Sequence, residues 1–230
     1  MPDVIKTRKS NLKIKKITNA INQKTSIQRK RNEINKQNAK NVDVIFGIDN
    51  GVTGTISAII PYSDKNIKIF FDETFSNTVL DFTQEIKYFD RLDWKKTKDW
   101  FELVLNEAAK NYNKPIIKSI AVIERPMVNP MRFKPSLIAV RAFEALTIVL
   151  DMLKLNYIVI DSKKWQHYFF GKNTALLDLK KESMDHGLNI IDEYKFINSS
   201  NEIEEIRGIM KKHLDADAFL MAMYCLKQLR

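Results

Sequence analysis

Hydrophobic residues in the first part of the chain fall into short runs of strand length. Three such runs cover residues 42–49, 55–61 and 67–71, and the turn-forming sequences Gly-Val-Thr-Gly and Ser-Asp-Lys-Asn separate them. Short apolar runs bounded by turn residues are typical of consecutive β-strands. The pattern therefore predicts a three-stranded meander.

From residue 93 onward, patterns of helix and strand type alternate. We expect a helix over about 93–111, a strand over 117–124, a loop with three prolines, and a long helix over 136–155. A strand over 157–161, a short helix over 162–170, a helix over 174–186 closed by Gly187, and a final helix to the C-terminus follow. This order predicts an α/β domain with a mixed sheet flanked by helices.

Three of the predicted elements carry an acid at the edge of an apolar run. Asp49 ends the first strand, Glu124 ends the fourth, and Asp217 lies in the first turn of the final helix. Apolar runs are expected to be buried, so these carboxylates would be fixed on rigid elements, where charges usually bind something. Two divalent ions that hydrolyse a phosphodiester lie about 3.5–4 Å apart and need hard oxygen ligands from several segments. The three acids fit that requirement.

Each acid also has a simpler interpretation when it is taken alone. Asp-Asn-Gly at 49–51 is a turn sequence, and Glu124 before Arg125 suits a salt-bridged strand end. Acids in the first turn of a helix, such as Asp215 and Asp217, complement the helix dipole without any further function. The three segments together are much harder to explain in this way.

The similarity to a known family extends beyond the acids. Residues 47–54 read Gly-Ile-Asp-Asn-Gly-Val-Thr-Gly, residues 162–166 read Ser-Lys-Lys-Trp-Gln before Gly171, and an Asp-Ala pair opens the final helix. With the strand ending at Glu124, these motifs resemble the phage branch of the RuvC-type Holliday-junction resolvases, which belong to the ribonuclease H-like superfamily. The resemblance runs from about residue 42 to the C-terminus. It implies two Mg²⁺ or Mn²⁺ ions per active site, a branched DNA partner and a homodimer, since symmetric nicking of a junction requires two active sites.

The spacing at the final helix departs from the family pattern. The family places two metal-binding residues three apart, whereas Leu214 stands three residues before Asp217. At about 100° per residue, His213 and Asp217 would share a helix face. Asp215 would point away within a helix but reaches the metals if it is the N-cap. We therefore expect the catalytic residues and metal ligands to be Asp49, Glu124, Asp215 and Asp217, with His213 as a further candidate metal ligand or, alternatively, a solvent-facing or capping residue.

Cationic and aromatic side chains near the acids predict how a nucleic acid would be held. The candidate nucleic-acid-binding residues are Arg125, Arg132, Phe133, Lys134, Lys163 and Lys164. The first four lie in or beside the proline-containing loop that follows the second acid, where cations would flank a scissile strand. The aromatic ring would stack on bases at a branch point, although a buried Phe fits the sequence nearly as well. The two lysines precede Trp165, for which a core position is the simpler expectation.

The net charge of +10 is concentrated at the N-terminus. Residues 1–41 carry twelve Lys or Arg against Asp3 and Glu33, whereas the remaining residues carry 26 basic and 26 acidic groups. This stretch has no aromatic side chain, so we expect a disordered or partly helical basic arm over 1–41 and a nuclease domain over 42–230. Such an arm would contact the phosphate backbone, with a solubilising or targeting leader as the alternative.

The composition agrees with an ordinary globular core. The chain has 230 residues, 44% of them apolar, and no apolar run approaches the roughly 20 residues of a membrane span. Its single cysteine, Cys225, excludes intrachain disulfides and is expected to be a small core residue rather than a nucleophile. We therefore expect no membrane partner and a reducing compartment that contains DNA, such as the cytoplasm, a nucleus or a mitochondrion.

These observations predict a metal-dependent, structure-selective endodeoxyribonuclease that resolves Holliday junctions or other branched DNA. A non-catalytic nucleic-acid-binding protein on the same fold is the first alternative. The second is an actin-like or sugar-kinase-type ATP-binding protein, whose first phosphate loop has a similar sequence. That class needs two such domains and further glycine-rich loops, but only Gly171, Gly187 and Gly208 lie outside the first motif.

Overall fold

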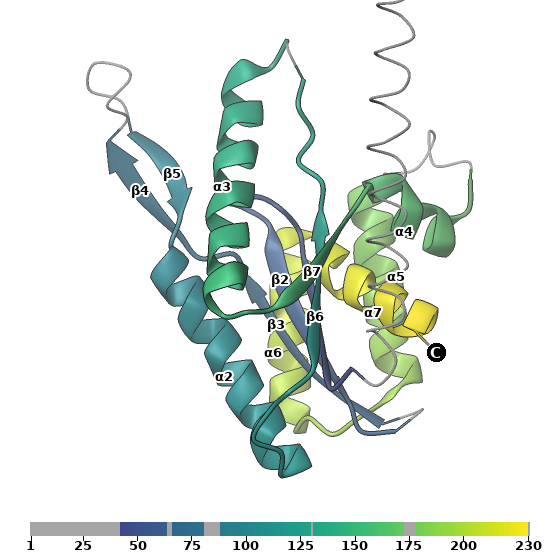
Figure 1. Ribbon diagram of the computed structural model, residues 1–230. Helices are drawn as coiled ribbons and strands as arrows, with labels where there is room; N and C mark the ends of the chain where they lie inside the picture. The colour runs from purple at the N-terminus through teal and green to yellow at the C-terminus, as the bar shows by residue number, and fades with distance from the viewer. Residues whose placement is uncertain (1–41, 64–65, 81–87, 130, 173–177, 230) are drawn as a thin grey trace, which may run out of the picture. The chain divides into compact units, whose positions relative to one another are not determined.

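A six-stranded mixed sheet forms the centre of the structure. The computed structural model describes residues 42–63, 66–80, 88–129, 131–172 and 178–229, and the predicted basic arm lies outside them. The strands follow the order β7-β6-β1-β2-β3-β8 (Figure 1). Their bounds are β1 (Val44–Ile48), β2 (Thr55–Pro61), β3 (Asn66–Glu73), β6 (Ser119–Glu124), β7 (Asn156–Ile160) and β8 (Lys195–Phe196).

The strand directions identify the fold. β1, β2 and β3 pair antiparallel as a meander, and β6 and β7 continue the sheet in parallel on the other side of β1. The short strand β8 pairs parallel with β3. A meander followed by parallel strands that add beside its first strand is the ribonuclease H-like arrangement, so the predicted fold class is confirmed.

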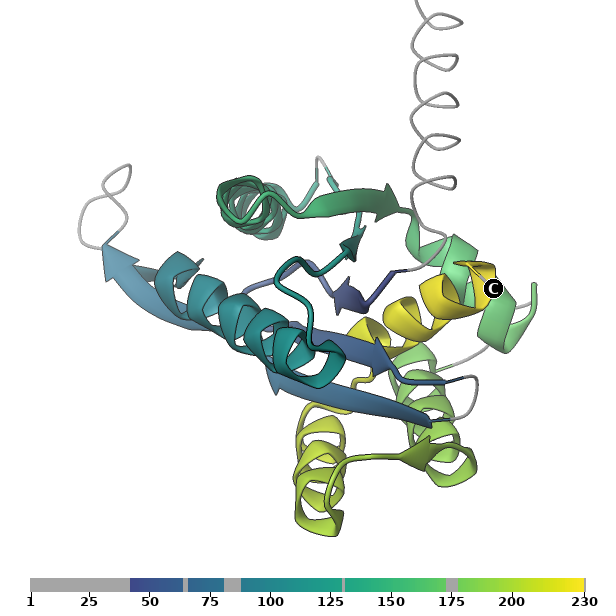
Figure 2. The ribbon, with the colours of Figure 1, turned by 60° about the horizontal axis from the view of Figure 1, so that its bottom comes forward.

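Helices cover both faces of this sheet (Figure 2). Their bounds are α2 (Trp94–Tyr112), α3 (Phe133–Met152), α4 (Ser162–Phe170), α5 (Leu179–Glu193), α6 (Ser200–His213) and α7 (Asp217–Leu229). On one face, α2 and α3 join a core that includes Phe46 and Phe101, whose ring centroids lie 4.8 Å apart. On the other face, α7 packs against β1, β2 and β6. Burial from both sides explains why every residue of β1 is buried.

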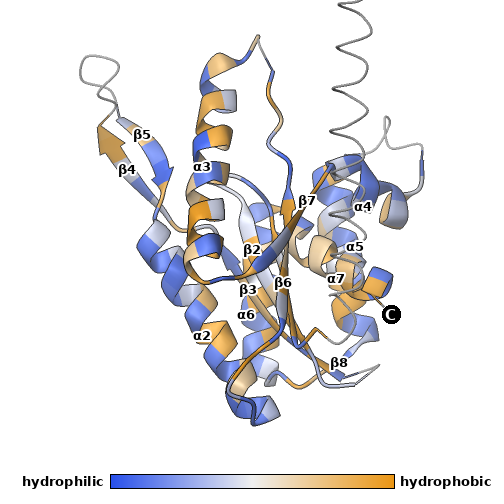
Figure 3. Cartoon of the chain, viewed as in Figure 1, coloured by the Kyte–Doolittle hydropathy of each residue, from blue (hydrophilic) through white to orange (hydrophobic). Residues whose placement is uncertain are grey.

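The hydropathy along the helices reflects this packing. Figure 3 shows hydrophobic and hydrophilic segments alternating along α2 and α3, as expected for helices with one face on the core. Cys225 is only 3% exposed, and burial raises the pKa of its thiol to about 12, so the predicted core role is confirmed. None of the described helices is long and apolar enough to cross a membrane.

Several features of the fold differ from the sequence predictions, and β8 and α6 are among the elements that were not predicted. A hairpin of β4 (Ser76–Leu80) and β5 (Tyr88–Leu92) forms a separate two-stranded sheet and was not predicted. The helix expected to close at Gly187 continues to Glu193 instead, and the residues 174–177 of that prediction lie outside the described part. Gly187 is buried inside α5. A β-carbon at this position would lie 2.5 Å from the β-carbon of Ala216, so helices α5 and α7 approach closely here. The glycine therefore serves close packing rather than helix termination.

Candidate functional site

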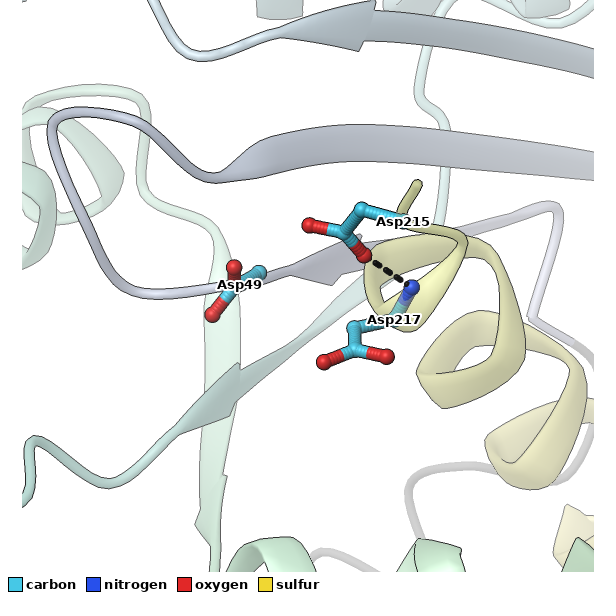
Figure 4. A group of neighbouring side chains, drawn as sticks. All are labelled: Asp49, Asp215 and Asp217. Atoms are coloured by element: carbon cyan, nitrogen blue, oxygen red, sulfur yellow. Dashed lines mark hydrogen bonds between the residues drawn. The ribbon is translucent and has the colours of Figure 1, made fainter. Parts of the chain in front are cut away.

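Three aspartates meet at one edge of the sheet. Asp49, Asp215 and Asp217 each offer a carboxylate oxygen, and these oxygens all lie within 4.8 Å of one another. Asp49 follows the end of β1, and the other two belong to the start of α7 and the residues just before it (Figure 4). The structure thus brings together acids that are more than 160 residues apart in the sequence.

Close packing between β1 and α7 produces this convergence. A β-carbon at Gly47 would lie 1.9 Å from the carbonyl oxygen of Ala218 and 2.8 Å from the nitrogen of Ala222. Only a residue without a side chain permits such an approach, because real β-carbons do not come this near to backbone atoms. Gly47 therefore allows the first turn of α7, which begins with Asp217, to lie directly beside the strand that ends before Asp49.

The last two acids are held at a break between two helices. Leu214 adopts a left-handed conformation with a φ of 50° and ends α6, so His213 and Asp217 lie in different helices. The predicted common helix face of His213 and Asp217 is therefore wrong. Asp215 instead precedes α7, and its Oδ1 accepts a hydrogen bond of 2.7 Å from the Asp217 backbone N–H (Figure 4). Ala216, whose carbonyl accepts the first helical hydrogen bond from Leu220, is the N-cap of α7, so Asp215 lies one residue before the cap and is not held to the helical angle.

The structure directs His213 toward a different partner. Its Nε2 lies 2.8 Å from Oε2 of Glu73, at the end of β3, and it is not part of the group of three aspartates. Lys212 lies 3.1 Å from the same glutamate oxygen. The end of α6 thus contacts the end of β3 through Glu73. The role of His213 as a metal ligand remains a prediction without support from this geometry.

Glu124 lies at the same edge of the sheet, outside the group of three. Ile48 pairs with Ile123 in the parallel β1–β6 ladder, so that Asp49 and Glu124 are the next residues of two neighbouring strands. Both line a cleft of about 320 Å³ together with residues of the loop after β6 and the start of α3. The carboxyl ends of adjacent parallel strands are a usual place for ligand sites in α/β folds.

Neutral side chains surround these carboxylates. Burial raises the pKa of Glu124, and the nearby side chains of Ser162 and of the fully buried Trp165 oppose that shift. Thr55, buried in β2, acts in the same sense on Asp215. Trp165 was expected to be a core residue and is 0% exposed, but it also borders the acid site.

The acids raise one another's pKa values. Asp49 has a pKa well above its ordinary value because of burial and then because of Asp215, Asp217 and Glu124. For Asp217, burial and the neighbouring Asp215 raise the pKa to about 7. Like charges held together in a partly buried site disfavour ionisation unless a cation is bound. The cluster is therefore poised to bind positive charge.

The donor set fits a hard divalent cation. Carboxylate oxygens are the usual ligands of Mg²⁺ and Mn²⁺, and a site for these ions needs acids from several segments with positions left for water and phosphate. Asp49, Asp215 and Asp217 provide such oxygens from two segments, and Glu124 adds a third at the cleft. The residues present thus fit one or more divalent ions, although the geometry does not identify the metal.

Sequence reasoning missed two residues of α5 beside the aspartates. The charge of Lys180, in the first turn of this helix, lowers the pKa of Asp49, Asp215 and Asp217. One turn further, the fully buried Ser183 donates a short hydrogen bond to Oδ1 of Asp217. The only available signal was the predicted helix itself, because a lysine and a serine on a helix carry no indication of what they face.

The six side chains predicted to contact nucleic acid are all exposed, and two of them line the cleft. Arg125 and Arg132 line the cleft together with Asp49 and Glu124, and Arg125 also forms an exposed ion pair of 3.0 Å with Asp161. The other four residues of the set are also exposed: Phe133, Lys134, Lys163 and Lys164. The phenylalanine belongs to the first turn of α3 rather than to the loop tip, and it is 70% exposed, so the alternative of a buried ring is wrong.

We compared the chain with protein families, curated proteins and solved structures. No protein-family model matches the chain, and no curated protein matches it. Among solved structures, it is similar to T. thermophilus RuvC in complex with Holliday junction substrate, with a TM-score of 0.41 and 10% sequence identity over 80% of this chain and 96% of that one. It is also similar to the Thermus thermophilus RuvC structure, with a TM-score of 0.35 and 9% identity over 74% of this chain and 93% of that one. The assignment of the fold rests on the strand order described above, and any function must rest on the site.

Proposed function

We propose that the chain is a divalent-metal-dependent endonuclease that hydrolyses phosphodiester bonds in branched DNA, including four-way junctions. The observation that carries this proposal is the convergence of Asp49, Asp215 and Asp217 within 4.8 Å at the sheet edge. Glu124 lines the adjoining cleft of about 320 Å³ together with Asp49. A purely structural role would not require buried like charges, which destabilise the fold when no cation is bound.

The acids have distinct roles in the proposed chemistry. Asp49, between Glu124 and the two later aspartates, would be shared by two ions, with Asp215 and Asp217 on one side and Glu124 on the other. Bound divalent ions supply a water of lowered pKa and a counter-charge for the leaving 3′-oxygen. The hydrogen bond from the Asp217 N–H fixes one oxygen of the Asp215 carboxylate at the start of α7 and so orients the other oxygen. Partial burial restricts the movement of the four carboxylates.

Cations around the cleft would bind the DNA. Arg125 and Arg132 lie on its rim, where they would contact phosphates on either side of the scissile bond. The exposed ring of Phe133 adjoins them and would stack on bases that a branch point leaves unpaired. We also assign a phosphate-contacting role to Lys134, Lys163, Lys164 and the basic arm at 1–41.

Symmetric cleavage of a four-way junction would require two copies of the chain. Helix α3 exposes Val140, Ile148 and Met152, and the last two are 54% and 53% exposed. Spacings of eight and four residues place them on one side of the helix, which suits contact with the same surface of a second copy. Sedimentation of the full chain with and without junction DNA tests this part of the proposal.

A cleavage assay on defined substrates tests the enzyme itself. End-labelled four-way junction, flap, linear duplex and RNA–DNA hybrid would be incubated with the full chain and Mg²⁺, Mn²⁺ or EDTA. We expect metal-dependent incision of the junction in preference to the duplex. Tight junction binding without incision in any metal would favour the non-catalytic alternative. An ATP-binding role has less support, because the described residues form a single six-stranded domain rather than the pair that this class requires.

A further inference from the structure

Ser183 joins two neighbouring parts of the acid site. It is 0% exposed in the second turn of α5 and faces the junction between α6 and α7. Its Oγ accepts a hydrogen bond of 3.2 Å from the Ala216 backbone N–H and donates a short hydrogen bond to Oδ1 of Asp217. A single hydroxyl therefore contacts both the backbone that leads into α7 and the side chain that begins it.

The direction of the second hydrogen bond follows from the first. A hydroxyl has one hydrogen, and the Ala216 N–H already occupies an acceptor position on the oxygen. The hydrogen is thus available to Asp217, whose carboxylate oxygens only accept when ionised. This leaves Oδ2 and the unused acceptor positions of Oδ1 for other partners. In a buried setting such a bond is stronger than it would be in water.

Close packing keeps Ser183 in this position. Gly187 lies one turn later on α5, and its α-carbon approaches Ala216 so closely that an added β-carbon would lie 2.5 Å from the β-carbon of that alanine. Helix α5 is thereby pressed against the junction at two successive turns. The serine cannot move away from Asp217 without a shift of the whole helix.

We propose that Ser183 is the positioning residue for Asp217, fixing which carboxylate oxygen is presented to a divalent ion. This inference rests on the proposed metal site and adds a residue of a different helix to it. Partners behind metal ligands orient the ligands, and their loss typically weakens metal affinity by roughly 10- to 100-fold. If Ser183 only satisfied the Ala216 N–H, its removal would change stability without a specific change in metal affinity.

Mn²⁺ binding to the full chain separates these roles. Affinities of wild type, Ser183→Ala, Asp217→Asn and the double variant would be measured by calorimetry, and thermal unfolding in EDTA would report stability. We expect Ser183→Ala to weaken Mn²⁺ binding by roughly 10- to 100-fold. In the Asp217→Asn background the same change should have little further effect, because two residues that act as one unit are not additive. Ser183→Cys keeps the volume similar with a weaker donor, and the same loss is expected should the alanine variant not fold.

Ser57→Ala provides a matched control. Ser57 is also 0% exposed, and its hydroxyl has no hydrogen-bond partner among the described residues. Its removal should leave Mn²⁺ affinity at the wild-type value. Equal Mn²⁺ affinity in wild type, Ser183→Ala and Ser183→Cys would overturn the positioning role alone. Wild-type protein that binds no Mn²⁺ would overturn the proposed metal site and this inference with it.

Discussion

The acid site and the cationic rim of the cleft are built in opposite ways. The aspartates are partly buried, lie at the end of β1 or at the start of α7, and are held by Gly47, Ser183 and the hydrogen bond between Asp215 and the Asp217 N–H. The rim consists of exposed residues of the loop after β6 and the first turn of α3, among them Phe133 at 70% exposure. The two regions adjoin along a single cleft.

This difference predicts that one region determines turnover and the other determines substrate affinity. Groups held by packing and hydrogen bonds need no reorganisation free energy when substrate binds, and such groups suit the chemical step. Exposed cations lose freedom on binding and contribute through screened charge, which suits substrate affinity. Substitutions in the acid site should therefore change turnover, whereas substitutions in the rim should change binding.

Loss of Asp49 should have the largest effect on turnover. Asp49→Asn removes a charged ligand at the centre of the group, so cleavage should fall by more than the roughly 100-fold seen when residues behind a ligand are lost. Junction binding and folding should stay close to wild type because the volume is unchanged. Single-turnover cleavage and a binding titration measure the two effects. Asp99→Asn, at an exposed acid on α2, is the control, and wild-type turnover by Asp49→Asn would exclude the nuclease assignment.

Asp215→Asn should separate the metal site from the hydrogen bond at the start of α7. An asparagine Oδ1 can still accept the hydrogen bond from the Asp217 N–H, so thermal stability in EDTA should be retained. Cleavage should fall strongly because a negative ligand is lost. His213→Ala should leave cleavage nearly unchanged, since its Nε2 lies beside Glu73. A loss of activity in His213→Ala with an active Asp215→Asn would reverse the two assignments.

The sequence predicted the sheet and the acids because both depend on local pattern. Apolar runs flanked by turns defined β1 and β2, and β2 was predicted with its observed bounds. The acids at the strand ends followed directly, since a charged residue that ends a buried run marks a sheet edge. Asp215 was expected to reach the other acids if it capped the final helix, and it instead reaches them from one residue before the N-cap Ala216, where its side chain is also outside the helix.

What was missed depends on contacts between distant segments. Leu214 is exposed and left-handed, a conformation for which leucine gives no signal, and no helix was predicted over residues 200–213, so the break between α6 and α7 was not anticipated. Gly187 suggested a helix end, whereas in the structure it allows Ala216 to pack closely against α5. Residues of β4 and β5 are largely exposed and pair mainly with each other, which leaves little hydrophobic periodicity to detect.

The acid site should make the metal-free protein less stable as the pH rises. The pKa of Asp217 is about 7 in the folded chain against an ordinary value of 3.8, so the folded state binds this proton more tightly than the unfolded state. The resulting stability is complete below about pH 4 and is lost between pH 4 and pH 7. At about 1.4 kcal/mol per pKa unit, the change should amount to a few kcal/mol.

Thermal unfolding in EDTA across that pH range measures this loss. Asp217→Asn should show a smaller decline than wild type, because it removes the titrating group. Saturating Mn²⁺ should reverse the trend in wild type, since the ion binds the ionised carboxylates and competes with protons. The same decline in wild type and Asp217→Asn would show that the group is not the source of the pH dependence.

The smallest effects are expected at the cationic rim, where each side chain contributes one screened interaction with DNA. Arg132→Ala and Lys134→Ala should each weaken junction binding modestly and reduce the slope of log affinity against log salt by about 0.9 for each phosphate that is no longer neutralised. Lys110→Ala, at an exposed lysine near the far end of α2, is the matched control and should keep the wild-type slope. Single-turnover cleavage at saturating enzyme and low salt should survive in all three variants, because the rim binds substrate while the aspartates carry the chemistry. If Arg132→Ala instead abolished cleavage with its salt slope unchanged, the arginine would belong to the acid site, and the division between the two regions would not hold.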